Sequence, residues 1–287
     1  MLRILLTAAA LVAAVAAFAQ EAPEGKRVEI NGMQMYYEVS GKGDPMIVLH
    51  GGFMNIPMMG EIVGRLAEAH RVYALELQGH GRTTDIDRPI TYPNLAGDVA
   101  AFMDAVGIEK ADVFGYSMGA IAGLRLAIDH PGKVDQLVFA SGIYDFQGWQ
   151  PAFREAIPQW TVEMFSGSPL AEEYKALAPD PEGFPALAEK LIALEKAPLA
   201  WGEEVAALST PVLIIAGDAD GSTLEHNVEM FRLLGGGVMG DTGKPLPASR
   251  LAILPATSHT ALIGQPDLMM AFIGPFLAGE APKGWFD

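Results

Sequence analysis

Cysteine is absent from the 287-residue chain, and basic residues are scarce. Without cysteine the protein cannot use disulfides, Cys-ligated zinc, iron–sulfur clusters or thiol catalysis. Only 19 Lys and Arg residues stand against 35 Asp and Glu residues, which gives a formal net charge of -16. A chain this acidic repels nucleic acid and anionic lipid surfaces. We therefore expect neither a nucleic-acid partner nor electrostatic binding to a membrane.

Charge is also nearly missing from residues 1–19, MLRILLTAAALVAAVAAFA, where Arg3 is the one charged side chain. The fifteen-residue, largely apolar stretch from Ile4 to Phe18 leads into Ala17-Phe18-Ala19, an A-x-A cleavage pattern. This arrangement is typical of a secretory signal peptide, and the stretch is short for a membrane span of about 20 residues. We expect cleavage near Ala19, a secreted or periplasmic protein, and no stable membrane association after cleavage.

Short apolar runs alternate with segments of helical spacing through the rest of the chain. Short runs rich in Val, Ile and Leu are typical of parallel strands buried on both faces. The runs are Met46–Leu49, Val72–Leu75, Val113–Phe114, Leu137–Ala140, Val212–Ala216 and Leu251–Leu254. The helical segments are Met59–Ala69, Leu95–Val106 and Met118–Asp129. This alternation predicts an α/β fold with a mostly parallel, doubly wound sheet.

Two stretches depart from the alternation. Lys26–Val39 holds two short alternating runs around Asn31-Gly32, which predicts a type I′ hairpin. From about 145 to 204 no pattern of a buried strand appears, and the stretch contains three of the four Trp residues. One interpretation is an additional helical layer. The other is a helical cap, inserted into a single domain of residues 20–287, with some of its aromatic side chains facing a ligand. We predict the cap.

A candidate nucleophile follows one of the expected strands. Ala111–Phe114 leads into Gly115-Tyr116-Ser117-Met118-Gly119, and a helical segment comes next. This is the G-x-S-x-G pattern in the strand–turn–helix setting that gives it meaning. The sharp turn lifts the Ser117 hydroxyl off the carboxyl edge of the sheet, and the helix amino terminus favours developing negative charge. Ser117 is therefore the predicted nucleophile.

A nucleophilic serine needs a base, and the base needs an orienting acid. His259 comes just after the last apolar run, where a loop can return over the nucleophile. Two candidate acids, Asp218 and Asp220, follow the run Val212–Ala216, and spacing alone does not choose between them. Asp145, after the preceding run, is a third and less favoured option. The chain order is serine, acid, histidine.

The other five histidines have structural interpretations. His70, His130 and His226 lie in or at the ends of amphipathic segments, which predicts exposed surface histidines. His50 and His80 lie in glycine-rich turns, where we expect them to orient the backbone. His259 is left as the predicted base.

From Val28 to about Phe276 the chain resembles the α/β-hydrolase fold superfamily, in its capped esterase and epoxide-hydrolase-like branch. The resemblance rests on His50-Gly51-Gly52-Phe53, Gly79-His80-Gly81-Arg82-Thr83, Gly115–Gly119, and the pair formed by Gly217-to-Asp220 and His259. In that family the acid usually lies three residues after such a glycine, which selects Asp220. The resemblance also implies an oxyanion hole made by the backbone N–H groups of Gly52 and Met118. It implies no metal and no organic cofactor.

The identity of the nucleophile narrows the expected chemistry. Epoxide hydrolases and haloalkane dehalogenases of this fold attack with Asp, so Ser117 favours acyl chemistry over both. We expect an exported serine hydrolase that cleaves small to medium carboxylic esters through Ser117, His259 and Asp220. The alternatives on the same scaffold are a lactonase, a perhydrolase, a C–C bond hydrolase and an acyltransferase. A non-catalytic ligand-binding protein is the alternative of a different class. Oligomeric state is left open.

Overall fold

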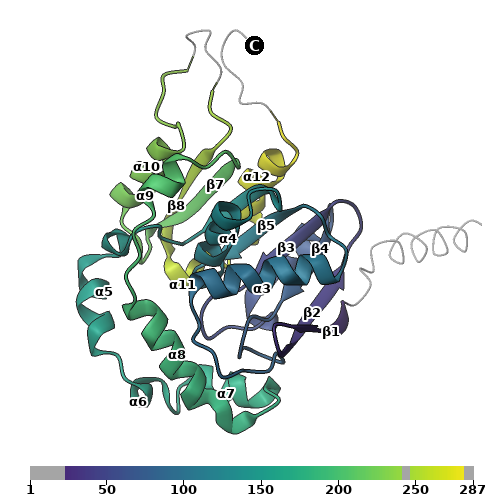
Figure 1. The fold of residues 1–287 in the computed structure, drawn as a ribbon. Helices are drawn as coiled ribbons and strands as arrows, with labels where there is room; N and C mark the ends of the chain where they lie inside the picture. Colours follow the sequence, from purple (N-terminus) through teal and green to yellow (C-terminus); the bar gives the residue numbers. More distant parts are fainter. Residues whose placement is uncertain (1–22, 241–245, 281–287) are drawn as a thin grey trace, which may run out of the picture.

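The computed structural model describes residues 23–240 and 246–280, and these form an eight-stranded sheet with helices on both faces (Figure 1). The strand order is β1-β2-β4-β3-β5-β6-β7-β8. The first two strands pair antiparallel, β2 also pairs antiparallel with β4, and every later pairing is parallel. The strands are β1 (Glu24–Ile30), β2 (Met33–Ser40), β3 (Pro45–Leu49), β4 (Arg71–Leu75), β5 (Ala111–Tyr116), β6 (Val134–Ala140), β7 (Val212–Ala219) and β8 (Arg250–Ser258). The predicted α/β fold with a mostly parallel, doubly wound sheet is confirmed.

Each of the six apolar runs lies within a strand, because a central parallel strand needs apolar side chains on both faces. All six residues of β5, for example, are buried. The expected hairpin is also present: Ile30 pairs with Met33, and Asn31 and Gly32 have φ angles of 49° and 88°. Positive φ at both central positions defines the type I′ turn.

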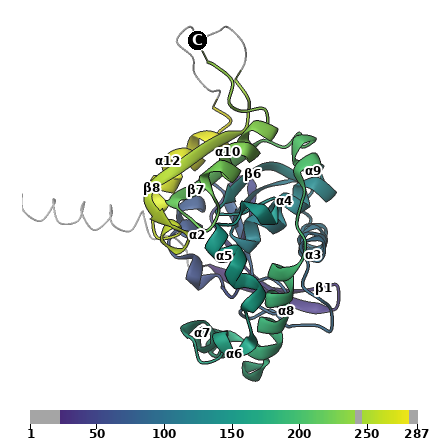
Figure 2. The ribbon, with the colours of Figure 1, turned by 90° about the vertical axis from the view of Figure 1, so that its left-hand side faces the viewer.

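Two hydrophobic clusters pack against the two faces of the sheet. Helices α3 (Tyr92–Ala105) and α4 (Met118–Asp129) contribute to one cluster, and α2 (Ile62–Leu66) and α12 (Pro266–Leu277) contribute to the other. Figure 2 shows these pairs on opposite sides of the sheet. The helix predicted for Met59–Ala69 is shorter than expected, because Gly60, with φ 60°, separates the 3-10 helix η2 (Pro57–Met59) from α2. Helix α10 (Leu224–Leu233) and α11 (His259–Leu262) flank β7 and β8.

Residues 145–204, which we call the helical insert, connect β6 to β7 and add no strand to the sheet. The insert contains η3 (Phe146–Gly148), α5 (Pro151–Ala156), η4 (Ile157–Gln159), α6 (Val162–Phe165), α7 (Pro169–Leu177), η5 (Pro181–Gly183), α8 (Phe184–Lys196) and the start of α9 (Gly202–Ala206). Helices α6, α7 and α8 lie outside the sheet in both views, and α5 lies outside it in Figure 1 (Figures 1 and 2).

The two ends of the insert meet. Asp145 and Ala200 form an isolated antiparallel bridge, and the Trp201 N–H donates to the Tyr144 carbonyl at 2.9 Å. A salt bridge of 2.7 Å between Lys190 Nζ and Asp85 Oδ2 ties α8 to the body of the protein. The insert is therefore anchored at its base and again along its longest helix.

The predicted signal peptide, residues 1–19, lies outside the described residues. Across residues 23–240 and 246–280, no helix combines the length and the apolar character needed to cross a membrane.

One buried carboxyl in the sheet lacks a full set of partners. Asp112, in β5, is buried, and its Oδ1 has no hydrogen-bond partner. Burial, followed by the negative charge of Asp135, raises the pKa of Asp112 to about 7. Between about pH 4 and pH 7 the folded protein keeps a proton on Asp112 that the unfolded chain has already released. The free energy of unfolding therefore falls as the pH rises through this range.

We expect Asp112→Asn to raise the free energy of unfolding at pH 8 by about 2 kcal/mol, because the amide removes a buried charge. At about pH 3, below both the folded and the unfolded pKa of this carboxyl, it is largely protonated in both states and the gain should be near zero. Urea unfolding at the two pH values measures the difference. Asp87→Asn, at an exposed position, serves as the control and should change neither midpoint; an equal gain from Asp112→Asn at both pH values would contradict the prediction.

Candidate active site

Ser117 occupies a strained turn between β5 and α4. Its φ of 54° and ψ of -120° place a non-glycine residue in a region that costs about 1–3 kcal/mol. The flanking glycines make the turn possible: a Cβ on Gly115 would lie 2.3 Å from the Gly119 carbonyl oxygen, and a Cβ on Gly119 would lie 2.3 Å from the Leu49 carbonyl oxygen. The Ser117 N–H donates to the Ala140 carbonyl at 2.9 Å, which pins the turn to β6.

His259 begins α11, directly after β8, and its imidazole reaches Ser117. The Ser117 hydroxyl lies 3.0 Å from His259 Nε2, and Nδ1 lies 2.7 Å from Asp220 Oδ1. A carboxylate at Nδ1 holds the proton there, which leaves Nε2 free to accept the serine proton. The Tyr116 hydroxyl donates to the His259 carbonyl at 2.8 Å and helps to fix the start of α11.

The Asp220 carboxylate is buried and fully satisfied. Besides His259, it accepts hydrogen bonds from the Gly221 N–H at 2.6 Å, the Ser141 hydroxyl at 2.5 Å and the Gly217 N–H at 3.2 Å. Burial acts to raise the pKa of Asp220, but the hydrogen bond and charge of His259, with the other donors, outweigh it and hold the pKa below its usual value. Asp220 therefore stays ionised beside the imidazole.

The other two candidate acids do not contact His259. Asp218 is exposed and accepts the Thr257 N–H at 3.0 Å. Asp145 caps η3 by accepting the Gln147 N–H at 2.7 Å. The structure thus brings together Ser117, His259 and Asp220, and it leaves the two alternatives aside.

Sequence reasoning missed Ser141. This serine follows β6, has a φ of 55°, and donates to Asp220 across 79 positions of the chain. Its place after a strand next to β7 was the available signal, because residues that follow neighbouring parallel strands meet at one edge of the sheet.

The interpretations of His50 and His80 are correct. The exposure predicted for the other three histidines is wrong, because His70 and His130 are only partly exposed and His226 is buried. His50 accepts the Leu77 N–H at 3.1 Å, and His80 accepts the Phe53 N–H at 3.2 Å, so both orient backbone as expected. Burial lowers the pKa of His80 to about 3, which keeps it a neutral acceptor. His226, predicted to be exposed, is buried: it stacks on Tyr144 and accepts the Tyr144 N–H at 3.2 Å.

The two residues expected to form an oxyanion hole lie next to each other beside Ser117. A Cβ on Gly52 would lie 3.8 Å from Met118 Sδ, and a Cβ on Gly51 would lie 3.3 Å from Ser117 Cβ. Met118 is the first residue of α4, so its N–H has no acceptor within the helix. Phe53, with φ 60°, ends this turn and is held by His80.

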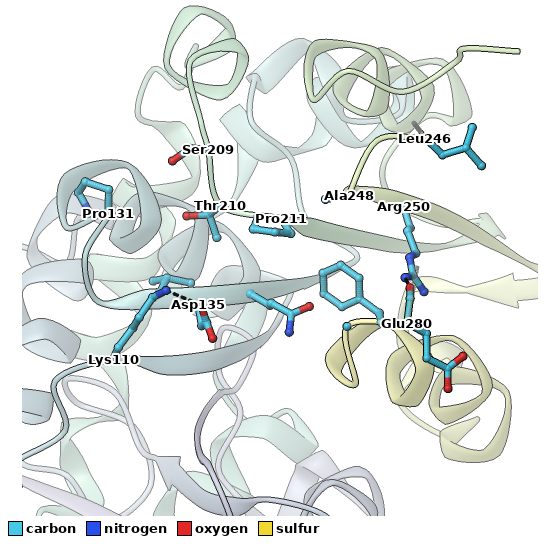
Figure 3. A pocket seen from close by; sticks show the side chains of 14 residues that line it. Lys110, Pro131, Asp135, Ser209, Thr210, Pro211, Leu246, Ala248, Arg250 and Glu280 are labelled. Carbon is cyan, nitrogen blue, oxygen red and sulfur yellow. Dashed lines mark hydrogen bonds and ion pairs between the residues drawn. The ribbon is translucent and has the colours of Figure 1, made fainter. Parts of the chain in front are cut away.

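A separate cavity of about 500 Å³ lies at the opposite edge of the sheet, where β6, β7 and β8 begin (Figure 3). Its cations have partners: Lys110 pairs with Asp135, and Arg250 donates to the Glu280 carbonyl. This cavity does not include any of the residues around Ser117, so it is not part of the candidate site. Within the described ranges, no group of three or more His, Asp or Glu side chains is placed to hold a metal ion.

The chain is similar in sequence to known α/β hydrolases. A family model described as the alpha/beta hydrolase fold matches residues 44–202, more than half of the chain. The dihydrolipoyllysine-residue acetyltransferase component of the acetoin cleaving system of Cupriavidus necator is 34% identical over 148 residues. That match covers 51% of this chain and 37% of the relative, so this chain spans well under half of that protein.

Two other matches extend over most of the chain. The pimeloyl-[acyl-carrier protein] methyl ester esterase of Aliivibrio salmonicida is 24% identical over 276 residues, which cover 86% of this chain and 97% of the esterase. The crystal structure of a carboxylesterase from Bacillus subtilis aligns with a TM-score of 0.69 at 18% identity, covering 90% of this chain and 92% of that one. At this identity the structural match speaks for the fold alone.

Proposed function

Because this chain belongs to the alpha/beta hydrolase family, we propose that it is an exported serine hydrolase that cleaves carboxylic esters of small to medium size. The observation that carries the proposal is the continuous hydrogen-bond chain from Ser117 through His259 to Asp220. The match to a methyl ester esterase over most of both chains supports an ester substrate. Export rests on the sequence of residues 1–19 alone.

The proposed reaction begins with Ser117. Its Oγ attacks the ester carbonyl carbon while His259 Nε2 takes the hydroxyl proton, and the Asp220 carboxylate stabilises the imidazolium that forms. The N–H groups of Gly52 and Met118 donate to the oxyanion, a contribution of about 3 kcal/mol per donor. The C–O bond to the alcohol then breaks, and His259 protonates the departing oxygen.

The second half of the reaction releases the acid. The acyl group is now bonded to Ser117 Oγ, and a water molecule attacks it while His259 again accepts a proton. Collapse of this second intermediate returns the proton to Ser117 and frees the carboxylic acid. The residues named are sufficient for both halves, and the proposal includes no cofactor.

The helical insert limits the size of the substrate. Partly buried aromatic side chains of the insert, including Phe153, Trp160 and Phe165, pack against the hydrophobic core, and Phe165 stacks on Phe53, the residue after Gly52. Such side chains suit the apolar part of a small or medium ester.

A series of p-nitrophenyl esters tests the proposal. We expect the purified protein to hydrolyse the acetate and butyrate, with kcat/KM falling steeply for acyl chains of about twelve carbons or more, since the aromatic side chains limit the space. A fluorophosphonate probe should label the folded protein and stop hydrolysis of the butyrate.

Two results would count against the proposal. If the acetate and butyrate are untouched while a lactone or a diketone is turned over, one of the other serine chemistries applies. If the folded protein does not react with the fluorophosphonate, Ser117 is not an activated nucleophile and the non-catalytic alternative gains support.

A further inference from the structure

Five aromatic side chains form a continuous series between the two ends of the candidate site. We call Phe53, Phe165, Trp160, Phe153 and Trp149 the aromatic series. Successive ring centroids lie 4.8, 5.5, 5.3 and 5.1 Å apart, and the Trp149 ring lies 6.3 Å from the His259 ring. The series therefore starts at Phe53, the residue after Gly52, and ends at Trp149, beside the ring of the base His259.

Most of these rings still have surface to offer a ligand. Trp149 is buried, whereas the other four members of the aromatic series are only partly buried. Aromatic faces carry partial negative charge and attract cations as well as apolar groups. The aromatic series can therefore bind either an apolar or a positively charged part of a substrate.

Glu195, in α8, is the one acidic residue on the inner stripe of that helix. The stripe runs through Leu187, Ala188 and Leu191, which are buried, and Glu195 continues it four residues after Leu191. The exposed side of the same helix carries Glu189. Helical spacing thus turns the Glu195 side chain towards the body of the protein.

Hydrogen bonds place this end of α8 between two parts of the aromatic series. Lys196 Nζ donates to the Trp160 carbonyl at 3.0 Å. Three residues further on, the Leu199 carbonyl accepts the Phe146 N–H at 2.9 Å, next to the segment that carries Trp149. Glu195 directly precedes Lys196, and its partly buried side chain lies within electrostatic range of His259 and of Tyr92.

Within residues 23–240 and 246–280, no Lys or Arg side chain pairs with the partly buried Glu195. Burial raises the pKa of Glu195 to about 7, and the nearby His259 imidazole acts in the opposite direction. Among the residues described, the Glu195 carboxyl forms no hydrogen bond or ion pair, and the neighbouring lysines are engaged elsewhere: Lys190 pairs with Asp85 and Lys196 with the Trp160 carbonyl. A carboxyl held near the base without a partner gains most from a ligand that brings positive charge.

We infer that the alcohol part of the natural ester carries a cationic amine, quaternary or protonated, which Glu195 and the aromatic series bind together. The inference deepens the proposed ester hydrolysis and rests on it. The cation belongs to the alcohol because His259 must protonate the leaving oxygen, so the leaving group lies on the side of Ser117 where His259 and Glu195 lie. Aromatic faces combined with a carboxylate are a general way to recognise ammonium groups. The net charge of -16 also draws cations towards the molecule.

A pair of esters with nearly the same shape tests the inference. Butyrylcholine and 3,3-dimethylbutyl butyrate differ in that a positively charged nitrogen replaces a carbon. We expect wild-type kcat/KM to favour butyrylcholine by at least about tenfold. Glu195→Gln, of nearly equal shape, should reduce that ratio at least about threefold, and the preference that remains is the contribution of the aromatic series. Glu189→Gln removes the same charge from the exposed side of α8 and should keep the wild-type ratio and activity.

Inhibition provides a second measurement that does not require a cationic substrate to react. Tetramethylammonium chloride should inhibit the hydrolysis of p-nitrophenyl butyrate competitively, whereas sodium chloride at equal ionic strength should not. Glu195→Gln should raise the inhibition constant of tetramethylammonium at least about tenfold.

The results test the cation site and the ester hydrolysis separately. Hydrolysis of both butyrates at equal efficiency by the wild type would overturn the cation site and leave ester hydrolysis standing. A preference for butyrylcholine that is as large in Glu195→Gln as in the wild type would overturn the role of Glu195. If the wild type hydrolyses neither these butyrates nor the p-nitrophenyl esters, the ester proposal fails and the inference fails with it.

Discussion

Ser117→Ala is expected to lower kcat/KM for p-nitrophenyl butyrate by about 10⁴- to 10⁶-fold. The substitution removes the only atom at this position that can form the acyl-enzyme, while backbone donors and substrate contacts remain. A residual rate above the uncatalysed reaction should persist for that reason. Steady-state kinetics with freshly purified protein, at a concentration high enough to detect the residual rate, measures the loss.

The fold should survive this change, because the Ser117 side chain contributes one hydrogen bond, to His259, and the strained backbone is held by Gly115 and Gly119. Thermal unfolding of the variant should therefore match the wild type within about 3 °C. Ser166→Ala alters an exposed serine of the helical insert and should leave the rate unchanged. A Ser117→Ala variant that keeps more than a tenth of the wild-type rate would place the nucleophile elsewhere.

Asp220→Asn is expected to lower kcat by about 10³- to 10⁴-fold, the second largest effect. An amide in this position presents an N–H group to His259 as readily as an oxygen, so the imidazole loses the acceptor that fixes its tautomer. Without the carboxylate, the imidazolium formed during attack also loses its stabilising charge. The pH dependence of kcat, measured alongside the rate, reports on both changes because both act through the base.

Asp218→Asn is the matched comparison, two residues away and with the same change of charge. Asp218 is exposed and holds the Thr257 N–H, which an asparagine oxygen can also accept, so kcat should stay within about twofold. Thermal unfolding of both variants distinguishes a lost catalytic group from a damaged β7–β8 edge. A large loss in Asp218→Asn with little change in Asp220→Asn would transfer the acid role to Asp218.

The sequence predicted the strands and the Ser117 turn well because both depend on local chemistry. Runs of β-branched residues and glycines at fixed offsets act over a few positions, and no distant contact is needed to interpret them. The choice between Asp218 and Asp220 is different, since side chains two residues apart on a regular strand point the same way. The pairing of β7 with β8 shifts between Gly217 and Ala219, and this irregularity separates an exposed Asp218 from a buried Asp220.

The error at His226 and the omission of Ser141 share a physical cause. Each depends on a contact between segments about eighty positions apart: His226 with Tyr144, and Ser141 with Asp220. The space for His226 exists because Gly148 has no side chain; a Cβ there would lie 2.4 Å from His226 Nδ1. An amphipathic pattern reports which face of α10 is apolar, and it cannot report that η3 will cover a histidine on its other face.

The bridge between Asp145 and Ala200 has a consequence for the history of such proteins. Because the chain leaves and rejoins the sheet at adjacent points, the segment between them can be lengthened, shortened or replaced in one genetic event without moving β6 or β7. Ser117, Asp220 and His259 all lie outside that segment, whereas Trp149 and Glu195 lie within it. Descendants of one ancestor could thus inherit the bond-breaking residues unchanged and diverge in what they accept, by exchanging a single contiguous stretch of sequence.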